Sequence, residues 1–248
     1  MRLSHLRPDY YDYFPTFACD ELGQRLESLP FHIATMLGLN NLRRAAEHPL
    51  GREGLRTYFS RSKSVQGNLL QDVLINAGIS SRVASAIGRV PRERFALPQF
   101  HQFSYLNHYL PFSMSSCVSA PGLVALMLEQ LRIEPEQHLV EIGIGSGYHA
   151  ACASEVVQNV CSIAGWDLNR RYIEFGTAIL NSLGYENIAV NEGNGLSENM
   201  RTELCDRLYV TAASFDGLPP ELIRSFHHGL RLQFVRAITR TEFELGKL

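Results

Sequence analysis

The segment HLVEIGIGSGYHAAC, residues 138–152, decides the fold of this chain. A short apolar run that contains an acidic residue leads into three alternating glycines, Gly143, Gly145 and Gly147, and an alanine-rich stretch follows. Glycine adopts backbone angles that other residues avoid, and it lets the chain pass close to a ligand. The pattern therefore predicts a strand, a tight loop and a helix whose positive N-terminal end faces a bound molecule.

Strand-like and helix-like segments alternate on both sides of this loop. We expect strands over residues 138–144, 159–167, 187–193 and 206–213, two more strands within 230–245, and helices over residues 120–131, 148–158, 168–185 and 219–229. Alternation of this kind implies an α/β fold of the Rossmann-like type, with a mostly parallel sheet and helices on both faces.

The residues before this region carry less regular patterns. We expect a helical N-terminal extension over residues 1–65, with a linker at 61–68, and a main domain over residues 66–248. Within the main domain, residues 68–90 predict two short amphipathic helices. Residues 91–121 contain four prolines and predict a long ordered loop.

Composition excludes several classes of protein. A net charge of −2 gives no basic surface of the kind that nucleic acids require, so we expect no nucleic-acid partner. No apolar run is long enough for a signal peptide or a membrane span, so we expect no membrane partner. The five cysteines are scattered without metal-ligand spacing, which predicts a cytoplasmic protein with no metal site: Cys19, Cys117, Cys152, Cys161 and Cys205.

Acidic residues flank the glycines in sequence. Glu141 precedes them, and Asp167 ends the next predicted strand, where an acidic side chain binds the ribose hydroxyls of a nucleotide-like cofactor. Asp167 is also suited to cap the helix that follows. The dinucleotide pattern has a glycine where this chain has Tyr148, and an acidic residue before the glycines suits a cationic ligand. These features favour S-adenosylmethionine over NAD.

Five segments together resemble the protein-L-isoaspartate O-methyltransferase family, in the family's order. VPRERFALP is similar to its V-P-R-E-x-F-V-P segment, CVSAPGLVALML to T-I-S-x-P-x-x-V-A-x-M, and VEIGIGSGYHAA to E-I-G-x-G-S-G-Y-x-A-A. LGYENIAVNEGNG resembles L-G-Y-x-N-V-x-V-x-x-G-D-G, and CDRLYVTAASFDGLPPELI resembles F-D-x-I-I-V-T-A-A-x-x-x-I-P-x-x-L. The resemblance runs from about Leu69 to Gly229 and implies that residues 66–248 form a methyltransferase domain.

The resemblance implies methyl transfer from S-adenosylmethionine to the free carboxylate of an isoaspartyl residue in a protein or peptide. A carboxylate is already ionised at neutral pH, so the reaction needs alignment and exclusion of water rather than a general base. The scattered histidines are therefore expected to pack or to lie at the surface. The resemblance also places Ser119 beside the substrate as the catalytic residue. Taken without the resemblance, Ser119 is suited to be the N-cap of the helix that follows, and the resemblance favours the functional role.

The candidate site combines these inferences with the positions that the resemblance implies. The expected cofactor-binding residues are Glu141, Gly143, Gly145, Ser146, Gly147, Tyr148, Asp167, Asn194 and Gly195. The expected substrate-binding residues are Cys117, Val118, Val210, Thr211 and Ala212. We expect the chain to act as a monomer on a protein or peptide substrate.

The sequence departs from the family pattern mostly on the substrate side. The family's G-D-G aspartate is Asn194, whose side chain still accepts a hydrogen bond from an adenine amino group, and its G-Y-G-Q segment is rebuilt over residues 112–117. Two alternatives therefore stay open. One is a dedicated natural-product enzyme that esterifies a peptide aspartate before aspartimide formation, and the other is a non-catalytic methyltransferase-like binding protein.

Overall fold

The computed structural model describes residues 58–113, 116–196, 205–214, 219–220, 230–237 and 243–247. The predicted extension up to residue 57 and most of the predicted helix over 219–229 lie outside these residues. None of the helices in the described part of the chain has the length and apolar character needed to cross a membrane.

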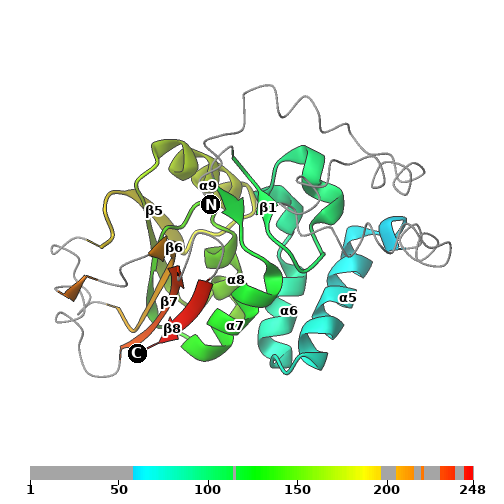
Figure 1. The fold of residues 1–248 in the computed structure, drawn as a ribbon, viewed down its shortest axis with the longest axis horizontal. Helices are drawn as coiled ribbons and strands as arrows, with labels where there is room; N and C mark the ends of the chain where they lie inside the picture. Colours follow the sequence, from blue (N-terminus) through cyan, green and yellow to red (C-terminus); the bar gives the residue numbers. More distant parts are fainter. Residues whose placement is uncertain are drawn as a thin grey trace.

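A six-stranded sheet forms one layer of the protein (Figure 1). Its strands, in the spatial order β5-β4-β3-β6-β7-β8, are β3 (His138–Ile142), β4 (Ser162–Asp167), β5 (Ile188–Glu192), β6 (Arg207–Ser214), β7 (Arg231–Ala237) and β8 (Phe243–Lys247). All neighbouring strands are parallel except β7 and β8, which are antiparallel. The predicted Rossmann-like fold and its mostly parallel sheet are confirmed.

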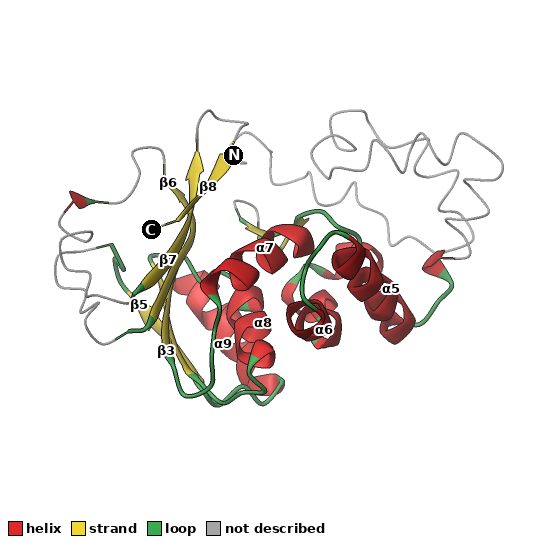
Figure 2. Ribbon diagram, turned by 90° about the horizontal axis from the view of Figure 1, so that it is seen from below, coloured by secondary structure: helices red, strands yellow, loops and turns green. Residues whose placement is uncertain are grey.

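Three helices pack on one face of the sheet, as Figure 2 shows: α7 (Pro121–Leu131), α8 (Tyr148–Val156) and α9 (Arg170–Ser182). The large hydrophobic core lies between them and the sheet. A smaller buried cluster occupies the opposite face and contains Val140, Ile142, Cys205, Leu208, Val210 and Leu232. Among the described residues, the helices that pack on the sheet lie on one face, so the predicted coverage of both faces stays a prediction.

Two further helices, α5 (Lys63–Asn76) and α6 (Ser81–Arg89), pack beyond the sheet-covering layer. Ser80 caps α6, because its hydroxyl accepts a hydrogen bond from the amide of Val83 at 3.4 Å. The predicted linker at residues 61–68 is wrong, since α5 begins at Lys63. The proposed division of the chain after residue 65 falls inside this helix and stays a prediction.

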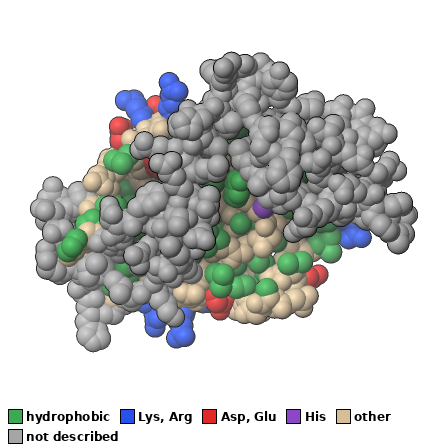
Figure 3. All heavy atoms as spheres, in the orientation of Figure 1, with side chains coloured by type: hydrophobic (Ala, Val, Ile, Leu, Met, Phe, Trp, Pro, Cys, Tyr) green, Lys and Arg blue, Asp and Glu red, His purple; other side chains and the backbone are tan. Residues whose placement is uncertain are grey.

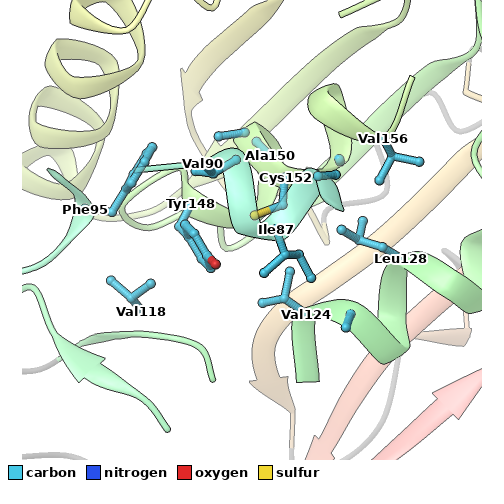
Figure 4. Packing of buried hydrophobic residues seen from close by; sticks show 14 of the residues in the cluster. Ile87, Val90, Phe95, Val118, Val124, Leu128, Tyr148, Ala150, Cys152 and Val156 are labelled. Atoms are coloured by element: carbon cyan, nitrogen blue, oxygen red, sulfur yellow. The ribbon is translucent and has the colours of Figure 1, made fainter. Parts of the chain in front are cut away.

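The predicted ordered loop between α6 and α7 contains two short 3-10 helices and a hairpin. These elements are η3 (Arg92–Phe95), η4 (Pro98–Phe103), β1 (Leu110–Pro111) and β2 (Cys117–Val118). Figure 4 shows how the large core joins these parts, with Tyr148 of α8 lying near Phe95 and Val118. The hairpin is therefore attached to the main core although its strands have only two residues each.

The distribution of basic side chains bears on the prediction that the protein binds no nucleic acid. In Figure 3, the visible Lys and Arg side chains of the described part stand at separate points along the rim of that face. The expectation that the protein binds no nucleic acid stays a prediction. Within the described ranges, no group of three or more His, Cys, Asp or Glu side chains is arranged to hold a metal ion.

Candidate active site

The glycine loop between β3 and α8 has the positive-φ backbone for which its sequence provides glycines. Gly143, Gly145 and Gly147 have φ angles of +87°, +55° and +86°, in the region that other residues rarely adopt. Two of these glycines also permit close packing. A Cβ at Gly143 would lie 2.7 Å from the backbone nitrogen of Ala212, and a Cβ at Gly147 would lie 2.9 Å from Leu180 Cδ1.

Asp167 ties the end of β4 to this loop. Its Oδ2 accepts a hydrogen bond from the amide of Gly145 at 3.0 Å, and its Oδ1 accepts one from the amide of Asn169 at 2.9 Å. Asp167 is not the N-cap of α9, because Asn169 holds that position and accepts from the amide of Arg171. The half-buried carboxylate of Asp167 thus lies beside the glycine loop, which is the position expected for a contact with the cofactor's ribose hydroxyls.

Glu141 lies directly beneath the loop and is only 1% exposed. The hydroxyl of Thr211 lies 3.0 Å from Glu141 Oε1 and 2.8 Å from the carbonyl oxygen of Gly143. Burial raises the pKa of Glu141 to about 8. Among the described residues, Glu141 Oε2 has no partner in hydrogen-bonding geometry. An orphaned buried oxygen of this kind suits a positively charged or hydrogen-donating ligand.

Two buried side chains that the sequence did not assign to the site are Tyr209, which lies beside Glu141, and His149, which packs against Tyr209. Tyr209 lies directly opposite Glu141 in the β3–β6 register, and the ring of His149 lies 4.9 Å from that of Tyr209. Burial lowers the pKa of His149 to about 3, so this imidazole is neutral at physiological pH. This agrees with the expectation that the histidines pack rather than catalyse.

Ser146 and Tyr148 have mainly structural side chains. The buried Ser146 hydroxyl accepts a hydrogen bond from the amide of Tyr148 at 3.4 Å, at the start of α8. The Tyr148 ring packs 5.6 Å from that of Phe95, and the Arg92 guanidinium lies 5.4 Å from its centroid. The Tyr148 side chain therefore belongs to the core, and only its backbone remains suited to the predicted cofactor contact.

Asn194 and Gly195 follow β5 at the same edge of the sheet. Asn194 is exposed, and its Oδ1 accepts a hydrogen bond from the amide of Leu196 at 3.0 Å. A Cβ at Gly195 would lie 2.9 Å from Ile142 Cγ1, so this glycine allows the loop to approach β3. The carboxyl ends of β3, β4, β5 and β6 thus surround one region, as expected for ligand binding in open α/β sheets.

Ser119 lies on the substrate side, directly after β2. It is not the N-cap of α7, because Ala120 holds that position, with Pro121 in the first turn and no capping side-chain hydrogen bond. The Ser119 hydroxyl has no hydrogen-bond partner in the described part of the chain. Ser119 is half-buried, and its hydroxyl does not cap the helix. The hydroxyl is therefore available to a substrate.

The other predicted substrate residues separate into two groups. Cys117 is exposed on β2, whereas Val118 is 2% exposed and belongs to the large core. Val210 is fully buried in the cluster on the opposite face of the sheet. Ala212 is exposed at the end of β6, beside the half-buried Thr211. The exposed or half-buried members are therefore those that a substrate can reach.

Arg92 supports the substrate side and is fully buried. Its Nη1 donates to the carbonyl of Ser104 at 2.7 Å, and its Nη2 lies 2.8 Å from the carbonyl of His108 and 2.9 Å from that of Ser119. Burial lowers the pKa of Arg92. No carboxylate pairs with it among the described residues, so main-chain oxygens and the face of the Tyr148 ring stabilise the charge.

A protein-family comparison decides the relationship that these residues indicate. The model of the protein-L-isoaspartate(D-aspartate) O-methyltransferases matches residues 65–237, well over half of the chain. The chain belongs to this family. The resemblance predicted from the five sequence segments is therefore confirmed.

Individual members of the protein-L-isoaspartate O-methyltransferase family show the extent of the match. The chain is 34% identical over 145 residues to protein-L-isoaspartate O-methyltransferase 2 of Archaeoglobus fulgidus, covering 58% of this chain and 66% of the relative. It is 31% identical over 171 residues to protein-L-isoaspartate O-methyltransferase 1 of the same organism, covering 69% of this chain and 77% of the relative. The matches thus span about two thirds to three quarters of these relatives.

A solved structure of the family shares the fold. It is a Plasmodium falciparum protein-L-isoaspartate O-methyltransferase in complex with S-adenosyl-L-homocysteine, with a TM-score of 0.61 and 20% identity, covering 72% of this chain and 87% of that one. At this identity the likeness supports the methyltransferase fold.

Three buried residues of the present chain were not placed at the site by sequence reasoning: Arg92, His149 and Tyr209. All three lie inside quoted family motifs, which was the available signal: Arg92 in VPRERFALP, His149 in VEIGIGSGYHAA and Tyr209 in CDRLYVTAASFDGLPPELI.

Proposed function

We propose that this protein transfers a methyl group from S-adenosylmethionine to the carboxylate of isoaspartyl residues in proteins or peptides. One arrangement carries the proposal: Glu141, the glycine loop and Asp167 meet at the carboxyl edge of the sheet. Membership of the family and the S-adenosyl-L-homocysteine bound to its Plasmodium relative support both the reaction and the cofactor.

The residues present fit this cofactor. The buried carboxyl group of Glu141 is suited to the cofactor's positively charged amino group, because that charge favours the ionised carboxylate over the protonated form that burial favours in the free protein. Asp167 is suited to the ribose hydroxyls, and Asn194 to the adenine amino group, because carboxylate and amide oxygens accept hydrogen bonds. When bound, S-adenosylmethionine supplies an electrophilic methyl group on a positively charged sulfur.

The protein's own part in the reaction is alignment. An isoaspartyl carboxylate is ionised at neutral pH, so no side chain has to remove a proton. The Ser119 hydroxyl donates a hydrogen bond to one carboxylate oxygen and holds the other toward the cofactor. Arg92 fixes the Ser119 backbone by donating a hydrogen bond to its carbonyl oxygen. Positioning of this kind is a large contribution where reacting atoms must lie in line.

The family match favours an isoaspartyl substrate over the two alternatives, a dedicated natural-product enzyme and a non-catalytic binding protein. The rebuilt segment over residues 112–117 is the sequence feature on which both alternatives rest. The monomeric state and the cytoplasmic location remain predictions.

The test uses labelled S-adenosylmethionine and two peptides that differ only in one residue. One peptide carries L-isoaspartate, and the other carries ordinary aspartate at the same position. We expect base-labile labelling of the isoaspartyl peptide alone, because methyl esters hydrolyse in mild base. Labelling of the aspartyl peptide would favour the alternative of an enzyme that esterifies ordinary aspartate. Cofactor binding without labelling of either peptide would contradict the proposal.

A further inference from the structure

Phe112 lies where the cofactor loop meets helix α9. Its ring covers Gly145, because a Cβ at that glycine would lie 3.3 Å from Phe112 Cζ and 3.5 Å from Cε1. The ring stacks on Phe175 with 5.6 Å between centroids, and it packs edge-on against Tyr172 at 5.1 Å. With 5% of its surface exposed, Phe112 is as buried as a core residue.

The loop is also held from the side of α9. A Cβ at Gly176, the residue after Phe175, would lie 3.0 Å from the carbonyl oxygen of Gly145. The backbone of the glycine loop therefore contacts α9 directly, and Phe112 contacts both. Close packing of this kind leaves the three parts little freedom to move separately.

Phe112 also begins the turn that leads to Ser119. Its amide donates to the carbonyl of Ser116 at 3.2 Å, and the strands on each side pair Leu110 with Val118. Ser113 Oγ donates to the hydroxyl of Tyr172 at 3.1 Å, which is a second link between the hairpin and α9. A short, hydrogen-bonded path thus connects the ring over Gly145 to Ser119.

We propose that Phe112 is a positioning residue that fixes Ser119 relative to the cofactor loop, an inference that rests on the proposed function. The ring contacts Gly145 at one end of the path, and the hairpin carries Ser119 at the other. Methyl transfer requires the carboxylate oxygen, the methyl carbon and the sulfur in line, so a displaced hairpin slows the reaction without preventing binding. The ring also excludes water from the surface of Gly145.

A matched pair of substitutions tests this role. Phe112→Leu removes the stacking on Phe175 and leaves space above Gly145. Phe59→Leu is the control, because Phe59 is also 5% exposed and packs against Tyr58 and Phe103, at 5.2 and 5.8 Å, rather than against the loop. Both variants are compared with the parent by thermal unfolding, calorimetric binding of S-adenosylhomocysteine, and steady-state methylation of an isoaspartyl peptide.

We expect both variants to lower the melting temperature by similar amounts. Only Phe112→Leu is expected to lower kcat, by about tenfold or more, with the peptide KM and the S-adenosylhomocysteine Kd within about threefold of the parent. A purely structural contribution would leave kcat of Phe112→Leu equal to that of Phe59→Leu, and that result would overturn the proposal. If Phe112→Leu does not fold, Phe112→Met takes its place, because methionine fills irregular space.

Hydrogen exchange gives a readout that does not depend on turnover. In the parent and in Phe59→Leu, S-adenosylhomocysteine is expected to slow amide exchange in both the glycine loop and the β1–β2 hairpin. In Phe112→Leu the protection is expected in the glycine loop alone, and equal hairpin protection in all three proteins would overturn the coupling. A parent protein that protects its hairpin but methylates no isoaspartyl peptide would contradict the proposed function while supporting the coupling.

Discussion

The guanidinium of Arg92 donates a hydrogen bond of 2.9 Å to the main-chain carbonyl of Ser119. The same buried group bonds to the carbonyls of Ser104 and His108, so one side chain fixes η4, the following loop and the end of β2. These three segments are thus held together by one side chain, although the β1–β2 hairpin is their only regular sheet structure among the described residues. The position of Ser119 depends on a cation that is separated from it by 27 residues in sequence.

Arg92→Lys is expected to lower the free energy of unfolding by about 2 kcal/mol or more, because a single ammonium cannot reach all the carbonyls and leaves some unpaired. Urea denaturation measures the loss. Arg89→Lys is the control, since Arg89 forms an exposed ion pair with Glu155 at 3.1 Å and its side chain is 52% exposed. That change is expected to cost less than about 1 kcal/mol. Equal losses in the two variants would show that the buried bonds of Arg92 contribute little.

Ser119→Ala is expected to reduce methyl transfer by about tenfold or more while changing stability by less than about 0.5 kcal/mol. The hydroxyl caps no helix, so its removal costs no capping hydrogen bond. Ser80→Ala is the matched control, because Ser80 caps α6 and also donates to Glu129 at 2.7 Å. Losing that cap is expected to cost about 1 kcal/mol with unchanged kcat. Labelled-methyl transfer and thermal unfolding separate the two effects, and a Ser119→Ala enzyme with parental kcat would remove Ser119 from the catalytic site.

Most of the fold could be predicted from the sequence because its signals are local. Each strand from β3 to β8 corresponds to an apolar segment that was expected as a strand, and the glycine loop joins β3 to α8 as predicted. The linker at 61–68 failed because a tertiary contact overrides its loop-like composition. A Cβ at Gly67 would lie 2.7 Å from the carbonyl oxygen of Gly88, so this glycine serves close packing of α5 on α6.

The candidate site was less predictable, because part of it depends on contacts between segments that are remote in sequence. Glu141 and Asp167 could be found because they stand at fixed offsets from the glycines, and the structure places both beside the loop. The capping alternatives for Ser119 and Asp167 were wrong by one and two residues, which is a distance that propensity alone does not resolve. The contacts of Arg92 and Phe112 join segments that are remote in sequence, so only the folded chain brings them together.

Gly145→Val tests whether the glycine loop between β3 and α8 is the cofactor site. Gly145 has φ +55°, and its Cβ position faces the ring of Phe112, so a valine is both strained and obstructed. Gly184→Val is the control, because Gly184 has φ +80° but no atom within 4 Å of its Cβ position. Both variants are expected to lose about 1–2 kcal/mol of stability from the left-handed backbone. Only Gly145→Val is expected to lose calorimetric binding of S-adenosylhomocysteine, and binding as tight as that of the parent would show that the loop is not the cofactor site.

Glu141 predicts a dependence of stability on pH. Burial raises its pKa from an ordinary value of 4.5 to about 8, so the folded protein binds this proton more tightly than the unfolded chain does. The stabilisation is complete below pH 4.5 and is lost as the pH rises through about 8. Tyr209 and Thr211 face the carboxyl group and favour its ionised form, whereas Asp167 adds a repulsive charge that acts in the same direction as burial.

Glu141→Gln cannot ionise and keeps an oxygen for the Thr211 hydroxyl. Its free energy of unfolding is therefore expected to rise relative to that of the parent between pH 5 and pH 8, by at most about 1.4 kcal/mol per pH unit. Urea denaturation at four pH values measures the difference. His149→Phe provides the opposite case, because burial lowers the pKa of His149 to about 3 and the parent should lose stability relative to this variant as the pH falls below 6.5. A Glu141→Gln difference that stays constant from pH 5 to pH 8 would mean that the folded protein does not hold the proton on Glu141.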